Sequence, residues 1–269
     1  MEEIINVING IVWSTPLIVL CLGTGLYFSV RTRFLQLRHV KEMFRLLFDG
    51  KSSESGVSSF QALSMSLAGR VGTGNIAGVA TAITFGGPGA LFWMWVVAFL
   101  GASTAFVEAT LAQIYKEKHL GQFRGGPAFY IERGLGVKWF AILFAIVSVI
   151  SAGILLPGIQ SNSVAAGLNN AFNLDSRITA VIVAVVFGAI IFGGVKRIAK
   201  VTEVVVPIMA LGYILIVLVI IGINLEALPG VISLVFTSAF SQDAAFGAVI
   251  GLAIQWGVKR GLYSNEAGQ

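Results

Sequence analysis

A ten-residue segment at 69–78 places four glycines and two polar side chains inside an apolar stretch long enough to cross a membrane. It consists of Gly-Arg-Val-Gly-Thr-Gly-Asn-Ile-Ala-Gly. Glycine weakens a helix, and polar groups lose their water at membrane depth. Backbone that departs from helix survives there only where it is buried in protein or lines an aqueous cavity. The segment therefore predicts an interrupted helix that binds a solute, which points to a transporter.

The groups in this segment suit a carboxylate group and a hard cation such as sodium. A carboxylate is stabilised by free N–H groups at the start of a half-helix, and we expect Thr73 and Gly74 to supply them. Glycine also allows a ligand to approach the main chain closely. Sodium prefers hard oxygen ligands. The expected sodium ligands are the main-chain or side-chain oxygens of Ala68, Gly69, Val71 and Asn75.

The segment has two other interpretations. Gly74-x-x-x-Gly78 is also the pattern of a small-residue face that packs helices together in membranes, and this remains open for Gly78. It leaves Arg70 and Asn75 unexplained. A dinucleotide-binding fingerprint is excluded, because the glycine spacing differs and no βαβ pattern surrounds it.

A second interruption is predicted over 256–266, after the apolar run 244–255. Both segments have an apolar half-helix, then glycine with arginine, then a polar turn containing asparagine, and they are expected to cross the membrane in opposite directions. Such a pair indicates an inverted-repeat secondary transporter. Trp256 and Gly257 are expected to shape the pocket around a methyl-sized side chain, with ordinary packing as the alternative for Trp256.

Gln160 is the best remaining candidate for substrate binding, because it is a polar side chain deep in the apolar run 139–168. Asn162 and Ser163 are weaker candidates, and an interhelical hydrogen bond is the alternative role for Gln160. Charged residues within candidate spans are expected to form ion pairs: Arg70, Lys259, Arg260 and Glu266. Neither a metal cluster around His39 and His119 nor a nucleophile–base arrangement stands out, so no enzyme is expected.

Composition sets the class of the protein. Of the 269 residues, 56% are hydrophobic and 12% are charged, about half the charged fraction of a soluble domain. The uncharged runs reach the roughly 20 residues needed to span a bilayer. We predict a single transmembrane domain over 1–269, with a basic amphipathic segment at 31–56 along the interface. Its seven helices are expected at 5–30, 58–84, 89–114, 138–168, 177–194, 202–223 and 244–265, and a shorter outer segment at 226–241.

The positive charges gather on alternate connections. Of the 15 Lys and Arg residues in predicted loops, 14 fall in the segments 31–51, 116–138 and 196–200. The positive-inside rule makes these loops cytoplasmic and places the N-terminus outside a cell membrane. The net charge of +5 therefore reflects topology and gives no indication of nucleic-acid binding.

Four motifs make the chain similar to the alanine or glycine:cation symporter family, also described as sodium:alanine symporters. They are Gly-Thr-Gly-Asn-Ile-Ala-Gly-Val-Ala at 72–80, Gly-Pro-Gly-Ala-Leu-Phe-Trp-Met-Trp at 87–95, Gly-Gly-Pro-Ala-Phe-Tyr-Ile-Glu at 125–132 and Lys-Arg-Gly-Leu-Tyr-Ser-Asn-Glu-Ala-Gly at 259–268. The resemblance implies an all-α leucine-transporter-type fold, with one extra N-terminal helix before two five-helix inverted repeats. It also makes the helix carrying Gln160 a wall of the substrate pocket.

Family members continue to about eleven helices, so the resemblance implies that this chain is an N-terminal portion, truncated after the start of the second repeat. We expect such a fragment to lack the partner repeat needed for transport. The implied function is sodium-coupled uptake of small neutral amino acids, alanine or glycine, by alternating access, with sodium co-transported and no organic cofactor. The alternatives are a proton-coupled carrier of the same fold and, from another class, a channel or a non-transporting membrane scaffold.

Overall fold

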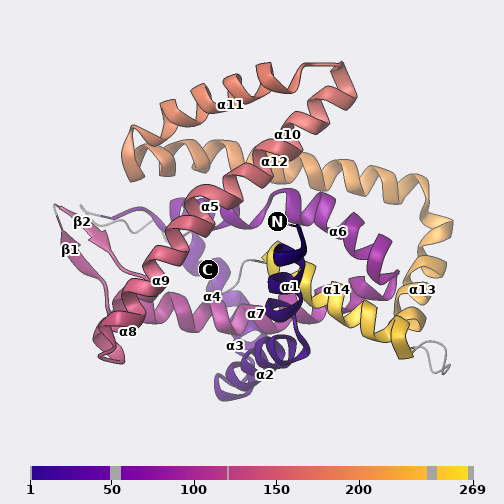
Figure 1. Ribbon diagram of the computed structural model, residues 1–269, viewed down its shortest axis with the longest axis horizontal. Coiled ribbons are helices and arrows are strands. Elements are labelled where there is room, and N and C mark those ends of the chain that lie inside the picture. The colour runs from indigo at the N-terminus through magenta and orange to yellow at the C-terminus, as the bar shows by residue number, and fades with distance from the viewer. Residues whose placement is uncertain (1, 49–55, 120, 241–246, 266–269) are drawn as a thin grey trace. The chain divides into compact units, whose positions relative to one another are not determined.

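The protein is described by a computed structural model that covers residues 2–48, 56–119, 121–240 and 247–265. These residues are almost entirely helical, with one short antiparallel hairpin (Figure 1). The helices of the first half are α1 (Glu2–Val12), α2 (Thr15–Arg31), α3 (Leu35–Arg38), α4 (Val40–Leu47), α5 (Ser59–Arg70), α6 (Thr73–Gly86) and α7 (Gly89–Ile114). Those of the second half are α8 (Pro127–Gly134), α9 (Lys138–Ile150), α10 (Leu156–Phe172), α11 (Ser176–Ile191), α12 (Gly194–Ile223), α13 (Leu228–Phe240) and α14 (Gly247–Asn265).

Several of these helices have the length and composition of membrane spans. Within the described residues, four helical segments are long and apolar enough to cross a bilayer: Val7–Arg31, Gly89–Ile114, Lys138–Phe172 and Gly194–Ile223. Shorter apolar helices cover Ser176–Ile191 and Leu225–Phe240. The predicted class, a helical membrane protein, is therefore confirmed.

Two predicted helices contain interruptions that follow from proline. The sequence predicts one helix over 5–30, whereas the structure has α1 and α2 with Trp13 and Ser14 between them. Pro16 cannot donate a hydrogen bond to the carbonyl four residues earlier, so α1 ends at Val12. The predicted helix 138–168 likewise contains a π-helical turn over Ser151–Leu155 between α9 and α10, which ends two residues before Pro157.

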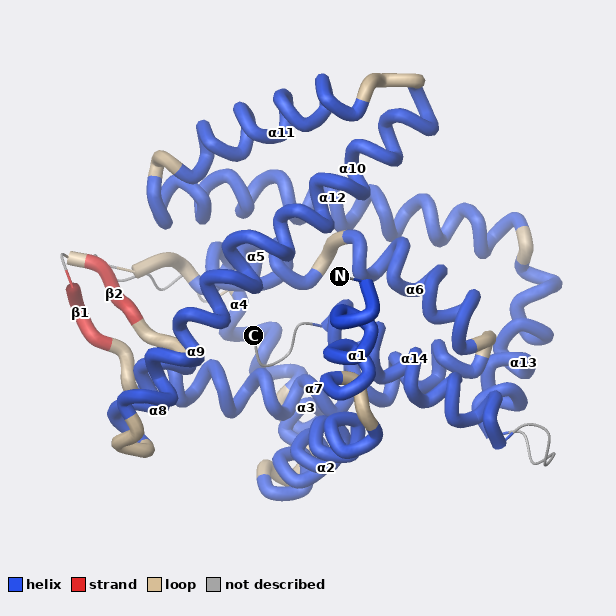
Figure 2. The backbone as a smooth tube through the Cα atoms, in the orientation of Figure 1, coloured by secondary structure: helices blue, strands red, loops and turns tan. Residues whose placement is uncertain are grey.

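Other bounds also differ from the sequence prediction. α12 begins eight residues before the predicted start at 202, so its first turns carry the basic cluster of 196–200. The predicted outer segment 226–241 consists of a 3₁₀ turn, Leu225–Ala227, followed by α13. The predicted interfacial segment 31–56 contains α3 and α4, and its residues 49–55 lie outside the described residues. The hairpin of β1 (Glu117–His119) and β2 (Gln122–Arg124) has no counterpart in the prediction (Figure 2).

The chain divides into two compact units. The first unit comprises Met1–Met43, Arg70–Val107 and Ala210–Gln269, and the second comprises Phe44–Gly69 and Glu108–Met209. α7 and α12 each contribute residues to both. In the first unit, α2, α7 and α14 meet at a small core of Ile18, Val97 and Val258.

Close approach of α2 to α7 depends on small residues in the first unit. A Cβ atom added at Gly25 would lie 2.9 Å from the Leu100 Cβ. One helical turn away, the Ser29 hydroxyl donates to the Ser103 hydroxyl at 3.1 Å, and Ser103 donates to the Gly25 carbonyl at 2.9 Å. Both serines are completely buried. Small residues and buried hydroxyls of this kind hold helices together where lipid removes the hydrophobic driving force.

The second unit contains the hairpin, α8 to α11 and the first part of α12. α8 lies against α9, and α10 against α11. Arg133 of α8 pairs with Glu117 of β1, which ties the hairpin to the helix that follows it. α11 begins at an N-cap, because the Asp175 carboxylate accepts the Arg177 N–H at 2.7 Å.

Candidate functional site

The interruption predicted at 69–75 lies at Val71 and Gly72, between the end of α5 and the start of α6. Asn75 closes the new helix start in two ways. Its side-chain oxygen accepts the Gly72 N–H at 3.1 Å, and its own N–H donates to the Gly72 carbonyl at 3.2 Å. The backbone at Gly72 is extended, so α6 is a separate half-helix whose N-terminal dipole begins at Thr73.

One face of α6 consists of small residues and is covered by α14. Gly74, Gly78, Ala82 and Gly86 recur every four residues and are all buried. A Cβ added at Gly74 would lie 3.0 Å from a Tyr263 ring carbon and 3.1 Å from the Ser264 Cα. At the other end of α6, a Cβ at Gly86 would lie 2.7 Å from the Trp256 Cβ. The two helices therefore run antiparallel, and the glycines allow them to lie close together.

The structure places Trp256 and Gly257 away from Thr73. The Trp256 ring stacks on Phe85 near the end of α6, with ring centroids 4.9 Å apart. Gly257 faces α7 instead, where an added Cβ would lie 2.7 Å from the Ala90 carbonyl oxygen. Because α6 has 14 residues, about 20 Å separate its two ends.

The second predicted interruption is wrong for the residues that the structure describes. α14 is a continuous helix from Gly247 to Asn265, and only residue 266 of the predicted break lies outside the described residues. Its glycines have a packing role, because Gly257 lies against Ala90 and Gly261 against Val97, both on α7. Glycine in a helix signals either a break or a close helix contact, and the sequence pattern alone cannot separate the two.

The cations of α14 contact aromatic rings. The Lys259 ammonium lies 5.3 Å from the Trp13 ring centroid and 5.1 Å from that of Trp256, and it donates to the Asn9 side-chain oxygen at 3.4 Å. The Arg260 guanidinium lies 5.5 Å from the Trp256 ring. Among the described residues, the electron-rich faces of these rings stabilise the cations of Lys259 and Arg260, where carboxylates were expected. Glu266, an expected ion-pair partner, lies outside them.

Three polar atoms on α14 are buried without a hydrogen-bond partner among the described residues: the Arg260 Nε, the Tyr263 hydroxyl and the Asn265 side-chain nitrogen. A buried polar group without a partner is costly, so such groups mark places where water or a ligand fits. Tyr263 also contacts Gly74 at the start of α6. No local sequence signal singled out these residues for a site, although Tyr263 and Asn265 belong to one of the motifs that carry the family resemblance.

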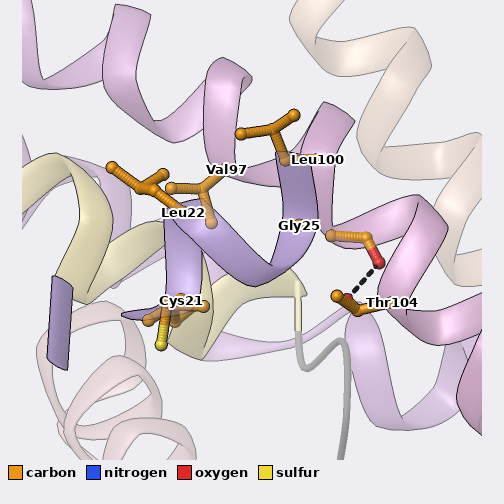
Figure 3. A pocket seen from close by; sticks show the side chains of 8 residues that line it. Cys21, Leu22, Gly25, Val97, Leu100 and Thr104 are labelled. Atoms are coloured by element: carbon orange, nitrogen blue, oxygen red, sulfur yellow. Dashed lines mark hydrogen bonds between the residues drawn. The ribbon is translucent and has the colours of Figure 1, made fainter. Parts of the chain in front are cut away.

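The described residues of the first unit enclose a small hollow and a larger, open one. The smaller one, about 30 Å³, is bounded mainly by α2 and α7 and holds no more than a water molecule (Figure 3). Its wall is largely apolar, and the Thr104 hydroxyl on it donates a hydrogen bond to the Gly101 carbonyl at 2.8 Å. Cys21 lies on this wall as a free cysteine. A larger open hollow of about 520 Å³ lies between α2 and α14 beside Gln255.

Comparison with known sequences decides the family. The profile of the sodium:alanine symporter family matches residues 1–269. The chain belongs to this family. It is a family of transporters and not of enzymes.

Several relatives align with most or all of the chain. YrbD of Bacillus subtilis (strain 168) is 62% identical over 269 residues, which is 100% of this chain and 56% of YrbD. The sodium/alanine symporter AgcS of Methanococcus maripaludis is 43% identical over 99% of this chain and 60% of its own length. The sodium/proton-dependent alanine carrier protein of Bacillus sp. (strain PS3) is 50% identical over 84% of this chain and 51% of its own length. The chain therefore spans a little over half the length of these relatives.

The remaining predicted site residues belong to the second unit. Ala68 and Gly69 are exposed in the last turn of α5, and Gln160 is half-buried in α10, just after the π-helical turn. The Ser163 hydroxyl donates to the Ile159 carbonyl of its own helix at 3.0 Å, which leaves its proton unavailable to a ligand. The grouping of Ala68, Gly69 and Gln160 with the start of α6 remains a prediction.

Proposed function

We propose that this symporter-family chain carries the binding half-helices of a sodium-coupled carrier for alanine, glycine or a similar small neutral amino acid. The observation that carries the proposal is the interruption at Val71 and Gly72, within a chain that the family profile matches from end to end. It would work by alternating access in a cell membrane, with the N-terminus outside and the basic loops in the cytoplasm.

The substrate carboxylate is assigned to the N–H groups of Thr73 and Gly74. They lie in the first turn of α6, where the helix dipole and the N–H groups of a helix start favour an anion. Gln160 is assigned a hydrogen bond to the same substrate. Tyr263 joins this proposed site because its ring touches Gly74 and its hydroxyl is buried without a partner among the described residues. The contacts of Trp256 and Gly257 favour packing for these two residues.

Sodium is the proposed co-substrate. The carbonyls of Ala68, Gly69 and Val71 lie at or beside the interruption, where helical hydrogen bonding ends. The Asn75 side-chain oxygen accepts one N–H and retains a second lone pair for a cation. A bound sodium would thus join α5 to α6 and order the carboxylate site, which gives a physical reason for coupled binding.

The fold proposed for the complete carrier is the leucine-transporter type with one extra N-terminal helix. The antiparallel contact of α6 with α14 supports this arrangement, since these helices open the first and second repeats in the proposal. In that fold the chain forms a single transmembrane domain. The partner repeat would supply the remaining walls and gates.

Binding of radiolabelled alanine to the complete protein that contains these residues tests the coupling. We expect saturable binding in sodium and at least about tenfold weaker binding in potassium. Equal binding in the two salts would remove the sodium claim. Counterflow exchange in proteoliposomes separates a carrier from a channel, because only a carrier exchanges labelled for unlabelled substrate without net current.

Proton coupling is the second candidate, and the name of the relative from Bacillus sp. (strain PS3) favours testing it. Alanine uptake should be driven by an imposed sodium gradient at equal pH under the leading proposal. Uptake driven by a pH gradient in sodium-free buffer would support the proton-coupled alternative instead.

A further inference from the structure

The beginning of α5 is fixed by one glutamine that makes three hydrogen bonds. The Gln61 N–H donates to the Ser58 hydroxyl at 3.1 Å, and the Gln61 side-chain oxygen accepts the Ser58 N–H at 3.1 Å. This reciprocal pair is a capping box. The side-chain nitrogen of Gln61 then donates to the Glu203 carboxylate at 2.9 Å. Gln61 therefore starts α5 and also ties it to α12, within the second unit.

Glu203 lies at a distinctive point of α12. It is the helix's single acidic residue, and an ionisable side chain in a membrane helix is a functional-site hypothesis because it is costly there. In a regular helix the backbone carbonyl of Glu203 would accept the N–H of residue 207. Residue 207 is Pro207, which has no N–H, so this backbone hydrogen bond is missing. The hydrogen bond from Gln61 to Glu203 thus reaches α12 at the point where the backbone hydrogen bonding of this helix is interrupted.

Few other contacts of α5 are buried. The helix has 12 residues, and Ser64 is the one that the structure buries. The larger apolar side chains of the helix are only partly buried, so a hydrogen bond to a carboxylate adds to what positions it. The tie lies at one end of α5, and the proposed sodium carbonyls of Ala68 and Gly69 lie at the other.

We propose that Gln61 and Glu203 form a latch that holds α5 in one access state of the carrier and opens in the other. This inference rests on the proposed function, and both are positioning residues that touch neither substrate nor sodium. Alternating access requires the half-helix beside the site to change its position relative to its neighbours. Water that enters as α5 moves can hydrate the freed carboxylate, so the latch can open without leaving a buried charge.

A residue exchange provides the sharpest test. Gln61→Glu places two carboxylates together, and Glu203→Gln replaces the carboxylate acceptor with a neutral amide. The double variant Gln61→Glu/Glu203→Gln restores an amide–carboxylate pair, and glutamate in place of Gln61 still completes the capping box. Glu203→Asp keeps the carboxylate but shortens the side chain by one methylene, so it should weaken the hydrogen bond to Gln61 less than Glu203→Gln does. Glu226→Gln, in the exposed 3₁₀ turn, is the matched control.

Two measurements on the complete protein follow the latch. Hydrogen exchange of residues 59–70 reports whether α5 is held, and sodium-driven alanine uptake reports turnover. Each single variant should speed exchange about threefold or more and change kcat with little effect on the KM for sodium. The double variant should return both to within about twofold of wild type, and Glu226→Gln should change neither.

The latch is overturned if the double variant resembles the single variants or if the single variants exchange like wild type. Failure of the proposed function looks different. In that case wild-type protein takes up no alanine in sodium, while the exchange of α5 still responds to the single variants and recovers in the double variant.

Discussion

At the residue scale, Asn75 combines a structural and a proposed functional role in one amide. Its side-chain oxygen accepts the Gly72 N–H and so caps the start of α6 after the interruption. The same oxygen is a proposed sodium ligand. Tyr263 complements it from α14, because its ring covers Gly74 next to the proposed carboxylate donors. The smallest units of the site are therefore a capped helix start and the aromatic ring that rests on it.

Asn75→Ala should weaken sodium-dependent alanine binding by about tenfold or more and lower the free energy of unfolding by about 1 kcal/mol. The substitution removes both the acceptor for Gly72 and the proposed cation ligand. Asn75→Asp retains an oxygen at the same position and serves as the control. Binding is measured with labelled alanine and stability by thermal unfolding in detergent. An alanine variant that loses stability but binds normally would restrict Asn75 to capping.

Tyr130, in α8 outside the membrane spans, gives a pH prediction. Burial, and then the negative charge of Glu108, raises the pKa of the Tyr130 hydroxyl above its usual value of about 10. The folded state therefore retains this proton more strongly than the unfolded state. The resulting stability is fully present below about pH 10 and is lost as the pH rises through the folded-state pKa.

Tyr130→Phe should consequently flatten the fall in the free energy of unfolding above about pH 10. Thermal unfolding between about pH 7 and pH 11 measures it, and the wild type and the variant should run parallel at the lower end of this range. Parallel curves at the alkaline end as well would contradict the prediction.

At the element scale, α14 is anchored to its neighbours by glycines on two sides. Gly74 and Gly86 of α6 admit the side chains of α14, while Gly257 and Gly261 of α14 admit α7. For Gly251 of the same helix, no atom from another part of the described chain lies within 4 Å of an added Cβ. Glycines of one helix are therefore expected to respond very differently to the same substitution.

Gly257→Ala should destabilise the protein by about 1–3 kcal/mol, because its Cβ would lie 2.6 Å from the Trp93 Cβ. Gly251→Ala should be neutral or stabilising by up to about 1 kcal/mol, since alanine favours helix and the position is open. Thermal unfolding of the two variants under one condition provides the measurement. Similar losses of stability at both positions would show that close packing does not distinguish them.

At the scale of the whole molecule, the distribution of charge predicts how the chain crosses the membrane. The basic segments 31–51, 116–138 and 196–200 alternate with connections that carry almost no positive charge. Lys and Arg are retained on the cytoplasmic side, so these segments should share that side. The exposed turn at Glu226 and the hairpin residue Lys118 are therefore expected on opposite sides.

Single-cysteine labelling tests this topology, because Cys21 is the chain's one cysteine and Cys21→Ser provides a cysteine-free background. In intact cells, a membrane-impermeant maleimide should label Glu226→Cys, and it should label Lys118→Cys only after permeabilisation. The reverse pattern would invert the proposed orientation. Equal labelling of both in intact cells would place them on one side and remove the alternation.

The sequence by itself determined the membrane class, the family and the place of the interruption at Val71 and Gly72. Each of these depends on hydropathy, glycine content or a motif, which are properties of short stretches of chain. The same local signals produced the incorrect break in α14, because a glycine that ends a helix and one that packs against a neighbour look alike in sequence.

Only the tertiary structure decided which residues meet. It placed Tyr263 on Gly74, moved Trp256 to the far end of α6, and joined Gln61 to Glu203 across 142 residues. Such contacts arise when distant elements bury their small or polar faces together, and no periodicity within one element specifies its partner. The interrupted helix could thus be located from the sequence, whereas the ring that covers it and the hydrogen bond that ties it required the packed chain.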